Sequence, residues 1–262
     1  MPGVWHIVDC MGVCMTLLEG ENAAMLVDTG YGIEDVADFM RHMTDLPLTV
    51  FLTHNHHDHA MGARCFPETY MLEADMADWR MFTDDKMRRR VLTQAIGKNL
   101  TVDEKTFLAG EIPLPKVMKP GVIDLGGLTA EIIEAPGHTP GSAVVYVPER
   151  KLLLSGDDWN PCTWLFFPQA LGLREYRSNM RGIQQLPFEK VLCPHRTGAM
   201  NQLIAPTGSV CTHPAIRQFA LMIRQDSGGI NHKFFFQSGF FDQVKHYSFR
   251  RRATADISEA DK

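Results

Sequence analysis

The chain has 262 residues, of which 45% are hydrophobic and 22% are charged, so it is long enough to bury a large core as a globular protein. Its formal net charge of -5 argues against a nucleic-acid partner, and no segment reaches the ~18 apolar residues of a transmembrane helix. The six cysteines lack disulfide or metal-knuckle spacing and no export signal is recognised, so we expect reduced thiols in a cytoplasmic protein.

The first part of the chain predicts strands that end in polar residues. Apolar and β-branched runs indicate strands at 4–9, 13–18, 24–28 and 49–53, with helices at 33–43 and 58–65. The third strand leads into Asp28-Thr29-Gly30, and the fourth leads into a histidine-rich loop at 53–59. Strand ends carry the functional groups in many α/β sheets, so both are candidate site positions.

The loop after the fourth strand has the spacing of a metal site. His54, His56, Asp58 and His59 place four potential ligands within six positions. Imidazole and carboxylate are donors that zinc accepts, and this number of them can hold more than one ion. His57 is expected to point away from the ligands.

A long segment at 73–119 then separates two sets of strands. It has helical spacing in two places and is too long for a simple connection. We predict a helical flap over the metal site. The alternative is a peripheral packing or dimer element, and the possibility of a homodimer stays open.

The second part repeats the rhythm of strands and helices. Strands are predicted at 129–135, 143–147, 152–155 and 190–193, helices at 174–185 and 214–225, and a closing hairpin at 233–237 and 244–250. The first, third and fourth of these strands lead into His138, Asp157 and His195. The layout predicts a single α/β or α+β domain over residues 1–262.

The ordered motifs closely resemble those of the metallo-β-lactamase fold superfamily. They are Val-Asp-Thr-Gly with Asp28, the histidine-rich loop, Pro-Gly-His-Thr-Pro-Gly with His138, Ser-Gly-Asp with Asp157, and His195. The resemblance implies a four-layer αβ/βα sandwich with metals at the strand ends. It also implies the ligand sets: His54, His56 and His138 for one ion, Asp58, His59 and His195 for the second, and Asp157 between them. Asp28 would orient a ligand, although Asp-Thr-Gly also suits an ordinary tight turn.

The resemblance and the chemistry of the ligands together predict a binuclear metal-dependent hydrolase. True β-lactam hydrolases of the superfamily lack the bridging aspartate, whereas thioesterase, lactonase and phosphodiesterase branches have it. Two divalent ions, Zn²⁺ by expectation with Mn²⁺ or Fe²⁺ as alternatives, lower the pKa of a shared water to about 7. The resulting hydroxide would attack a small ester, thioester or lactone, with Asp58 accepting or returning the proton.

Two other activities remain as alternatives: a mononuclear iron oxidoreductase like the persulfide dioxygenases, and a phosphodiesterase of the same superfamily. A binding protein without activity would require lost ligands, and none is lost. The substrate is expected to be a small molecule. Trp159, Trp164 and Phe167, in an aromatic loop after Asp157, are candidate substrate contacts, with core packing as the alternative. Arg196 is a candidate partner for an anionic group, with a surface salt bridge as the alternative.

Overall fold

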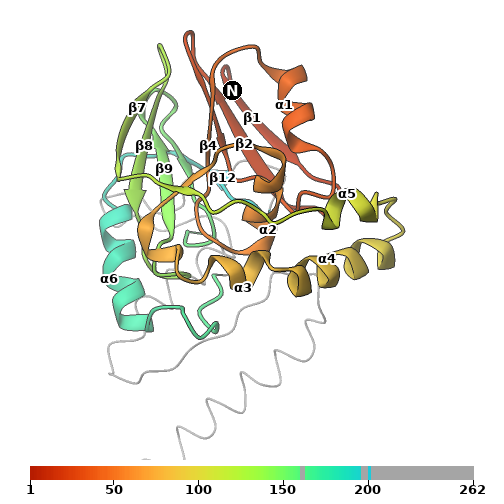
Figure 1. The fold of residues 1–262 in the computed structure, drawn as a ribbon. Coiled ribbons are helices and arrows are strands. Elements are labelled where there is room, and N and C mark those ends of the chain that lie inside the picture. Colours follow the sequence, from red (N-terminus) through yellow and green to blue (C-terminus); the bar gives the residue numbers. More distant parts are fainter. Residues whose placement is uncertain (160–162, 196–199, 202–262) are drawn as a thin grey trace, which may run out of the picture.

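The computed structural model describes residues 1–159, 163–195 and 200–201 (Figure 1). The predicted helix at 214–225 and the predicted hairpin at 233–237 and 244–250 lie outside these residues. Arg196 also lies outside them.

The first sheet contains six strands in the order β1-β2-β3-β4-β5-β6. They are β1 (Val4–Val8), β2 (Cys14–Glu19), β3 (Ala24–Val27), β4 (Leu48–Phe51), β5 (Tyr70–Met71) and β6 (Lys116–Val117). β3 and β4 run parallel, with Val27 paired to Phe51. Their carboxyl ends therefore meet, which brings Asp28 beside the start of the histidine-rich loop.

The second sheet also contains six strands, in the order β12-β11-β10-β9-β8-β7. They are β7 (Gly121–Asp124), β8 (Thr129–Glu134), β9 (Ala143–Val147), β10 (Leu152–Leu154), β11 (Lys190–Leu192) and β12 (Met200–Asn201). β10 and β11 are parallel, with Leu154 paired to Leu192. The residues that follow them, including Asp157 and His195, therefore leave the sheet at the same edge.

Alternating side chains of the strands build a four-layer structure. Val27 lies in the hydrophobic cluster between the two sheets, whereas its neighbour Leu26 packs with Met40 of α1 (Val36–Met43) on the outer face. On the other side, Val144 packs with Tyr176 of α6 (Leu173–Ile183). Figure 1 shows α1 and α6 on opposite outer sides of the sheets. The predicted αβ/βα sandwich is confirmed.

The predicted strands with strong apolar periodicity agree with the structure to within a residue or two at each end. The helix predicted at 58–65 is in fact a short α2 (His57–Ala60) followed by the 3-10 helix η1 (Met61–Cys65). Four strands, β5, β6, β7 and β12, were not predicted from the sequence. Three of these have two residues each, which is too short for a periodic pattern.

The segment at 73–119 is mostly helical, with β6 near its end, and packs against the end of the first sheet. It contains η2 (Glu73–Asp75), α3 (Trp79–Thr83), α4 (Asp85–Gly97) and α5 (Glu104–Leu108). Trp79, Val91 and Phe107 are buried in one cluster with Leu52 and Met61. This segment is therefore anchored beside the histidine-rich loop.

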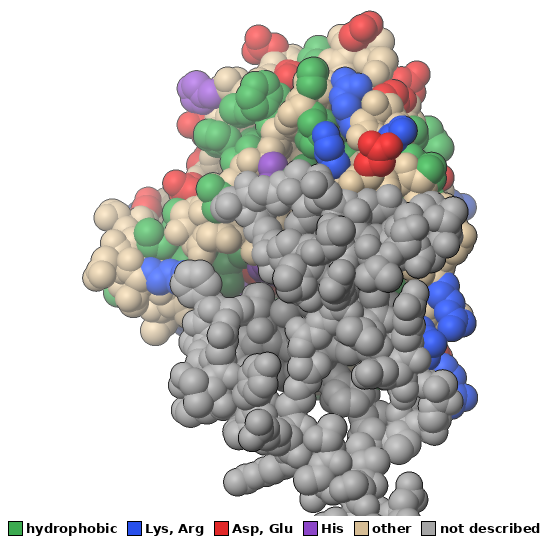
Figure 2. Space-filling view, turned by 180° about the vertical axis from the view of Figure 1, so that it is seen from behind, with side chains coloured by type: hydrophobic (Ala, Val, Ile, Leu, Met, Phe, Trp, Pro, Cys, Tyr) green, Lys and Arg blue, Asp and Glu red, His purple; other side chains and the backbone are tan. Residues whose placement is uncertain are grey.

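The surface carries a mixture of side chains. Figure 2 shows acidic, basic and apolar groups intermingled over the described part of one face, consistent with the modest net charge of -5. Among the described residues, none of the helices has the length and apolar character needed to cross a membrane.

Candidate metal centre

The structure brings all seven predicted ligand residues together at the ends of the two sheets. Potential donor atoms lie within 4.8 Å of one another in three sets: His54 with His56 and His138, Asp58 with His59 and His195, and His54 with His59 and Asp157. The first set is called here the three-histidine group and the second the mixed group. The third set joins the two groups.

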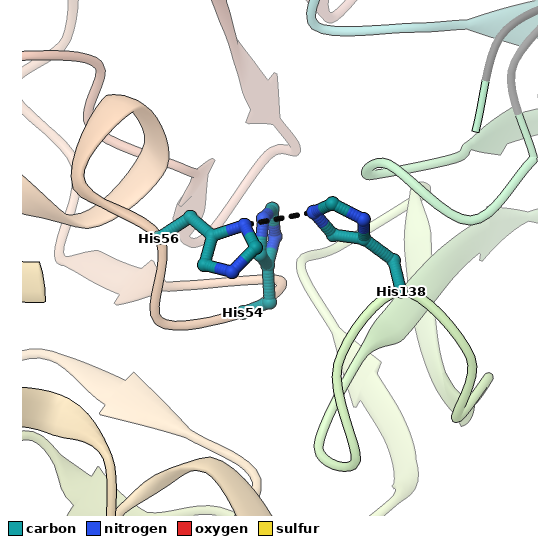
Figure 3. Close-up of side chains that lie close together, drawn as sticks. All are labelled: His54, His56 and His138. Atoms are coloured by element: carbon teal, nitrogen blue, oxygen red, sulfur yellow. Dashed lines mark hydrogen bonds between the residues drawn. The ribbon is translucent and has the colours of Figure 1, made fainter. Parts of the chain in front are cut away.

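The three-histidine group combines loops from both sheets (Figure 3). His54 and His56 follow β4, and His138 follows β8. The His56 Nδ1 and His138 Nε2 atoms are 2.8 Å apart, and the His54 ring centroid lies 4.7 Å and 5.0 Å from those of His56 and His138. His54 Nε2 is buried without a hydrogen-bond partner among the described residues. A buried imidazole nitrogen in that position fits a metal ligand.

The outer nitrogen of each of these histidines is also held, as is usual for metal-ligating imidazoles. The three contacts are His54 Nδ1 to Thr53 Oγ1 at 3.0 Å, His56 Nε2 to the Gln169 amide at 3.2 Å, and His138 Nδ1 to the Trp164 carbonyl oxygen at 2.6 Å. A ring held at one nitrogen presents the other in a defined direction. These contacts fix the direction of all three inner nitrogens and leave lone pairs at those of His54 and His138. The Gln169 amide donates to His56 Nε2, so His56 carries its proton on the inner nitrogen, Nδ1, from which a metal would displace it.

In the mixed group, Asp58 and His59 come from α2 and His195 follows β11. Asp157 lies between the two groups. Its Oδ1 is 3.0 Å from His195 Nε2 and 3.6 Å from His59 Nε2, and its Oδ2 is 3.5 Å from His138 Nε2. This position suits a carboxylate that contacts two ions.

Asp28 orients one histidine of each group. Its carboxylate accepts hydrogen bonds from the Thr53 backbone N–H at 2.8 Å and hydroxyl at 3.0 Å, and lies 3.0 Å from His59 Nδ1. Because a carboxylate only accepts, His59 keeps a proton on Nδ1, so its neutral form presents a lone pair at Nε2. The Thr53 hydroxyl donates to Asp28 and so accepts from His54 Nδ1, which leaves a lone pair at His54 Nε2. Asp28 thus sets both tautomers, from a backbone φ of 64° that favours few residues besides Asn, Asp and Gly.

The two groups differ in their electrostatics. Burial lowers the pKa of every histidine in the three-histidine group, so these rings are neutral at neutral pH. Burial also disfavours charge on His59 and His195, but the carboxylates of Asp157 and Asp58 outweigh it and raise the pKa of both. Burial by itself would raise the pKa of Asp58, but the neighbouring histidines have the larger combined effect and lower this pKa to about 2. The mixed group therefore holds protons that a metal would displace.

An aromatic wall stands beside the three-histidine group. The rings of Phe82 and Phe167 lie 4.3 Å and 4.7 Å from the His56 ring. Phe166 stacks on Phe167 at 4.5 Å, and Trp164 lies 6.2 Å from Phe167. Two of the predicted substrate contacts, Trp164 and Phe167, are therefore next to the site, and Phe82 from α3 joins them without having been predicted.

Trp159 does not share this position. It is 5% exposed and packs in the cluster beneath α6, with its ring 5.9 Å from that of Phe188. This placement favours the core-packing alternative for Trp159. His57 lies outside the ligand sets, with its ring 5.5 Å from that of Tyr31, as expected.

Other residues around the site were missed by the sequence analysis. Asp158 accepts a hydrogen bond from the His138 backbone N–H at 2.7 Å, and burial raises its pKa well above the ordinary value. Its position directly after Asp157 was the available signal. Asp75 and Gln169 had no comparable signal, because neither lies next to a ligand in the sequence. Of the described cysteines, Cys10 and Cys65 carry free thiols.

Comparison with known proteins adds a family and several relatives. The family model of the metallo-β-lactamase superfamily matches residues 8–195. The acyl-coenzyme A thioesterase MBLAC2 of Gallus gallus is 26% identical over 168 residues, which are 57% of this chain and 59% of the relative. The hydroxyacylglutathione hydrolase of Bartonella tribocorum is 26% identical over 162 residues, covering 61% of this chain and 53% of the relative.

Solved structures agree in fold. A metallo-β-lactamase family protein from Thermus thermophilus has a TM-score of 0.56 and 20% sequence identity, with 86% of this chain and 79% of that chain covered. At this identity the likeness concerns the fold alone. The chain spans less than two thirds of the length of the curated relatives that it matches.

Proposed function

This chain belongs to the metallo-β-lactamase superfamily, and on that basis we propose that it is a binuclear metal-dependent hydrolase of a small ester, thioester or lactone. One observation carries the proposal. The Asp157 carboxylate lies 3.5 Å from His138 Nε2 of the three-histidine group and 3.6 Å from His59 Nε2 of the mixed group. In this position one side chain can contact an ion in each group, at the distance between ions that is usual in binuclear sites.

The residues of this chain fit divalent metals. The donors are imidazole nitrogens and carboxylate oxygens, as zinc prefers, and the inner nitrogen of His54 is buried with no hydrogen-bond partner among the described residues. Ions bound there would lower the pKa of a shared water and polarise a substrate carbonyl.

Several residues have distinct roles in the proposed reaction. Asp58, ionised and 16% exposed at its side chain, is the proposed proton acceptor and donor. Asp28 keeps the ligand tautomers fixed. Trp164 and Phe167 are proposed to hold the apolar part of the substrate against the three-histidine group and to keep water away from it.

The two curated relatives suggest where to begin with substrates. One is named as an acyl-coenzyme A thioesterase and the other as a hydroxyacylglutathione hydrolase. Acyl thioesters are therefore the first substrate class to test, followed by lactones and simple esters. Phosphodiesters serve as the comparison class.

The test is metal content and turnover in the wild type and in Asp157→Ala. We expect two zinc or manganese ions per chain, and in the variant a loss of at least one ion and of about 100-fold or more in kcat/KM, equivalent to ~2.7 kcal/mol. Asp38→Ala is the matched control, because Asp38 is an exposed carboxylate on α1 paired with Arg41.

Two results would count against the proposal. Wild-type turnover and metal content in Asp157→Ala would remove the bridging role. A single iron per wild-type chain together with oxygen consumption would favour the persulfide-dioxygenase alternative instead.

A further inference from the structure

Asp75, at the end of η2, is a buried carboxylate that binds two separate loops. Its side chain accepts hydrogen bonds from the Gly141 backbone N–H at 2.6 Å, from the Thr139 hydroxyl at 2.7 Å and from the Asn55 backbone N–H at 3.2 Å. Its own backbone oxygen accepts a further bond from the Asn55 side-chain amide at 2.9 Å. Asp75 is only 1% exposed, so no water competes for these contacts.

Both loops carry ligands of the three-histidine group. Asn55 stands between His54 and His56 in the chain, and Thr139 follows His138 directly. The first loop leaves one sheet and the second loop leaves the other. Asp75 therefore joins the two halves of the group, although it touches none of the three histidines.

The close approach of the second loop depends on glycine. A Cβ atom added at Gly141 would lie 2.6 Å from the Asp75 backbone nitrogen and 2.7 Å from its Cγ atom. Any side chain at residue 141 would push the loop away from the carboxylate. The hydrogen bond between Gly141 and Asp75 therefore requires both the carboxylate at residue 75 and the glycine at residue 141.

Asp75 also lies near the start of the helical segment whose Phe82 ring lies against His56. We propose that Asp75 is a positioning residue that fixes the separation of His56 and His138 and so tunes the three-histidine group for its metal. This inference rests on the metal site of the proposed function and not on its substrate. The mixed group has its own support, Asp28 at His59, and depends less on Asp75.

The variant Asp75→Asn tests this role with little change in volume. Its amide can replace only one carboxylate oxygen as an acceptor, and the NH2 group then faces a backbone N–H donor from one of the loops. Asp103→Asn is the matched control. Asp103 caps α5 in the same helical segment, accepts hydrogen bonds from Thr106 and lies outside the ligand groups.

Each variant is combined with His195→Ala, which removes one ligand of the mixed group and keeps the three-histidine group. Co²⁺ is titrated against a competing chelator, and its visible absorption spectrum reports the ligand geometry. We expect Asp75→Asn to weaken Co²⁺ binding about 10–100-fold and to change the spectrum, and Asp103→Asn to do neither. Thermal melts of the metal-free proteins verify that both variants fold.

Unchanged Co²⁺ affinity and spectrum in Asp75→Asn would overturn the proposal, as would equal losses in Asp103→Asn. Thr139→Val provides a milder perturbation should Asp75→Asn not fold. It removes one hydrogen bond to Asp75, and a smaller weakening in the same direction is expected; wild-type binding in that variant would also count against the role of Asp75. Co²⁺ binding is measured without turnover, so a wild type that binds Co²⁺ normally but hydrolyses no substrate would refute the proposed function alone.

Discussion

The variant Asp28→Asn tests how the tautomer of His59 affects metal binding while the position of the His59 ring stays nearly the same. Asparagine has nearly the same volume and tolerates the φ of 64° at this residue. The Thr53 backbone N–H can only donate, so it retains its hydrogen bond when the amide oxygen occupies the Oδ1 position. The amide NH2 then faces His59 Nδ1, which must become an acceptor. The His59 proton moves to Nε2, where the metal would bind.

The structure leaves two possible orientations for the new amide in Asp28→Asn, and each has its own cost. Reversing the His59 tautomer should weaken metal binding by the mixed group about 10–100-fold, which corresponds to ~1.4–2.7 kcal/mol. The opposite amide orientation keeps the tautomer but sets NH2 against the buried Thr53 N–H. That arrangement should cost about 1–3 kcal/mol of folding stability instead. One of the two losses is therefore unavoidable.

Two assays distinguish the loss of metal affinity from the loss of folding stability. The first is a competition titration with Zn²⁺, and the second is urea unfolding of the metal-free protein. Asp9→Asn is a suitable control, because the Asp9 carboxylate accepts backbone N–H bonds from Met11, Gly12, Val13 and Tyr31 and lies outside the ligand groups. It should lose stability without losing Zn²⁺ affinity. Wild-type affinity and wild-type stability together in Asp28→Asn would refute the assigned role of Asp28.

Three further predictions concern pH, packing and substrate. As the pH falls from about 8 to about 6, Zn²⁺ affinity should fall ~10-fold per pH unit for each proton displaced at the mixed group, since His59 and His195 have raised pKa values, and should change little at the three-histidine group. Zn²⁺ is titrated over this pH range with variants that keep only one of the two ligand groups. Equal slopes of Zn²⁺ affinity against pH for the two groups would contradict the assigned protonation states. Gly137→Ala should destabilise the fold by about 1–3 kcal/mol in thermal melts, because its Cβ would lie 2.4 Å from the Tyr176 ring; an unchanged melting temperature would contradict this. Phe167→Ala should raise KM for thioesters with apolar acyl groups more than for acetyl thioesters, and equal changes would assign the ring to packing.

The seven candidate ligand residues could be predicted from the amino-acid sequence alone, and the resemblance of its motifs to a known family implied the sandwich fold. Strands such as Ala143–Val147 have continuous apolar patterns, and the polar residues at their ends stand out against them. His54, His56, Asp58 and His59 lie in one short loop, so their spacing is visible without any knowledge of folding. A cluster of ligand-type residues within one loop can be recognised from sequence spacing alone. The structure places these four residues together with His138, Asp157 and His195.

The surroundings of the candidate ligands could be seen only in the folded structure. Asp75 meets Gly141, which is 66 residues away, and Gln169 meets His56, which is 113 residues away. Trp159 and Trp164 lie in the same aromatic loop, yet the first packs in the core and the second supplies a carbonyl to His138. Such contacts depend on how two sheets and a helical segment pack together, because burial and direction of a side chain follow from long-range packing and not from neighbours in the chain.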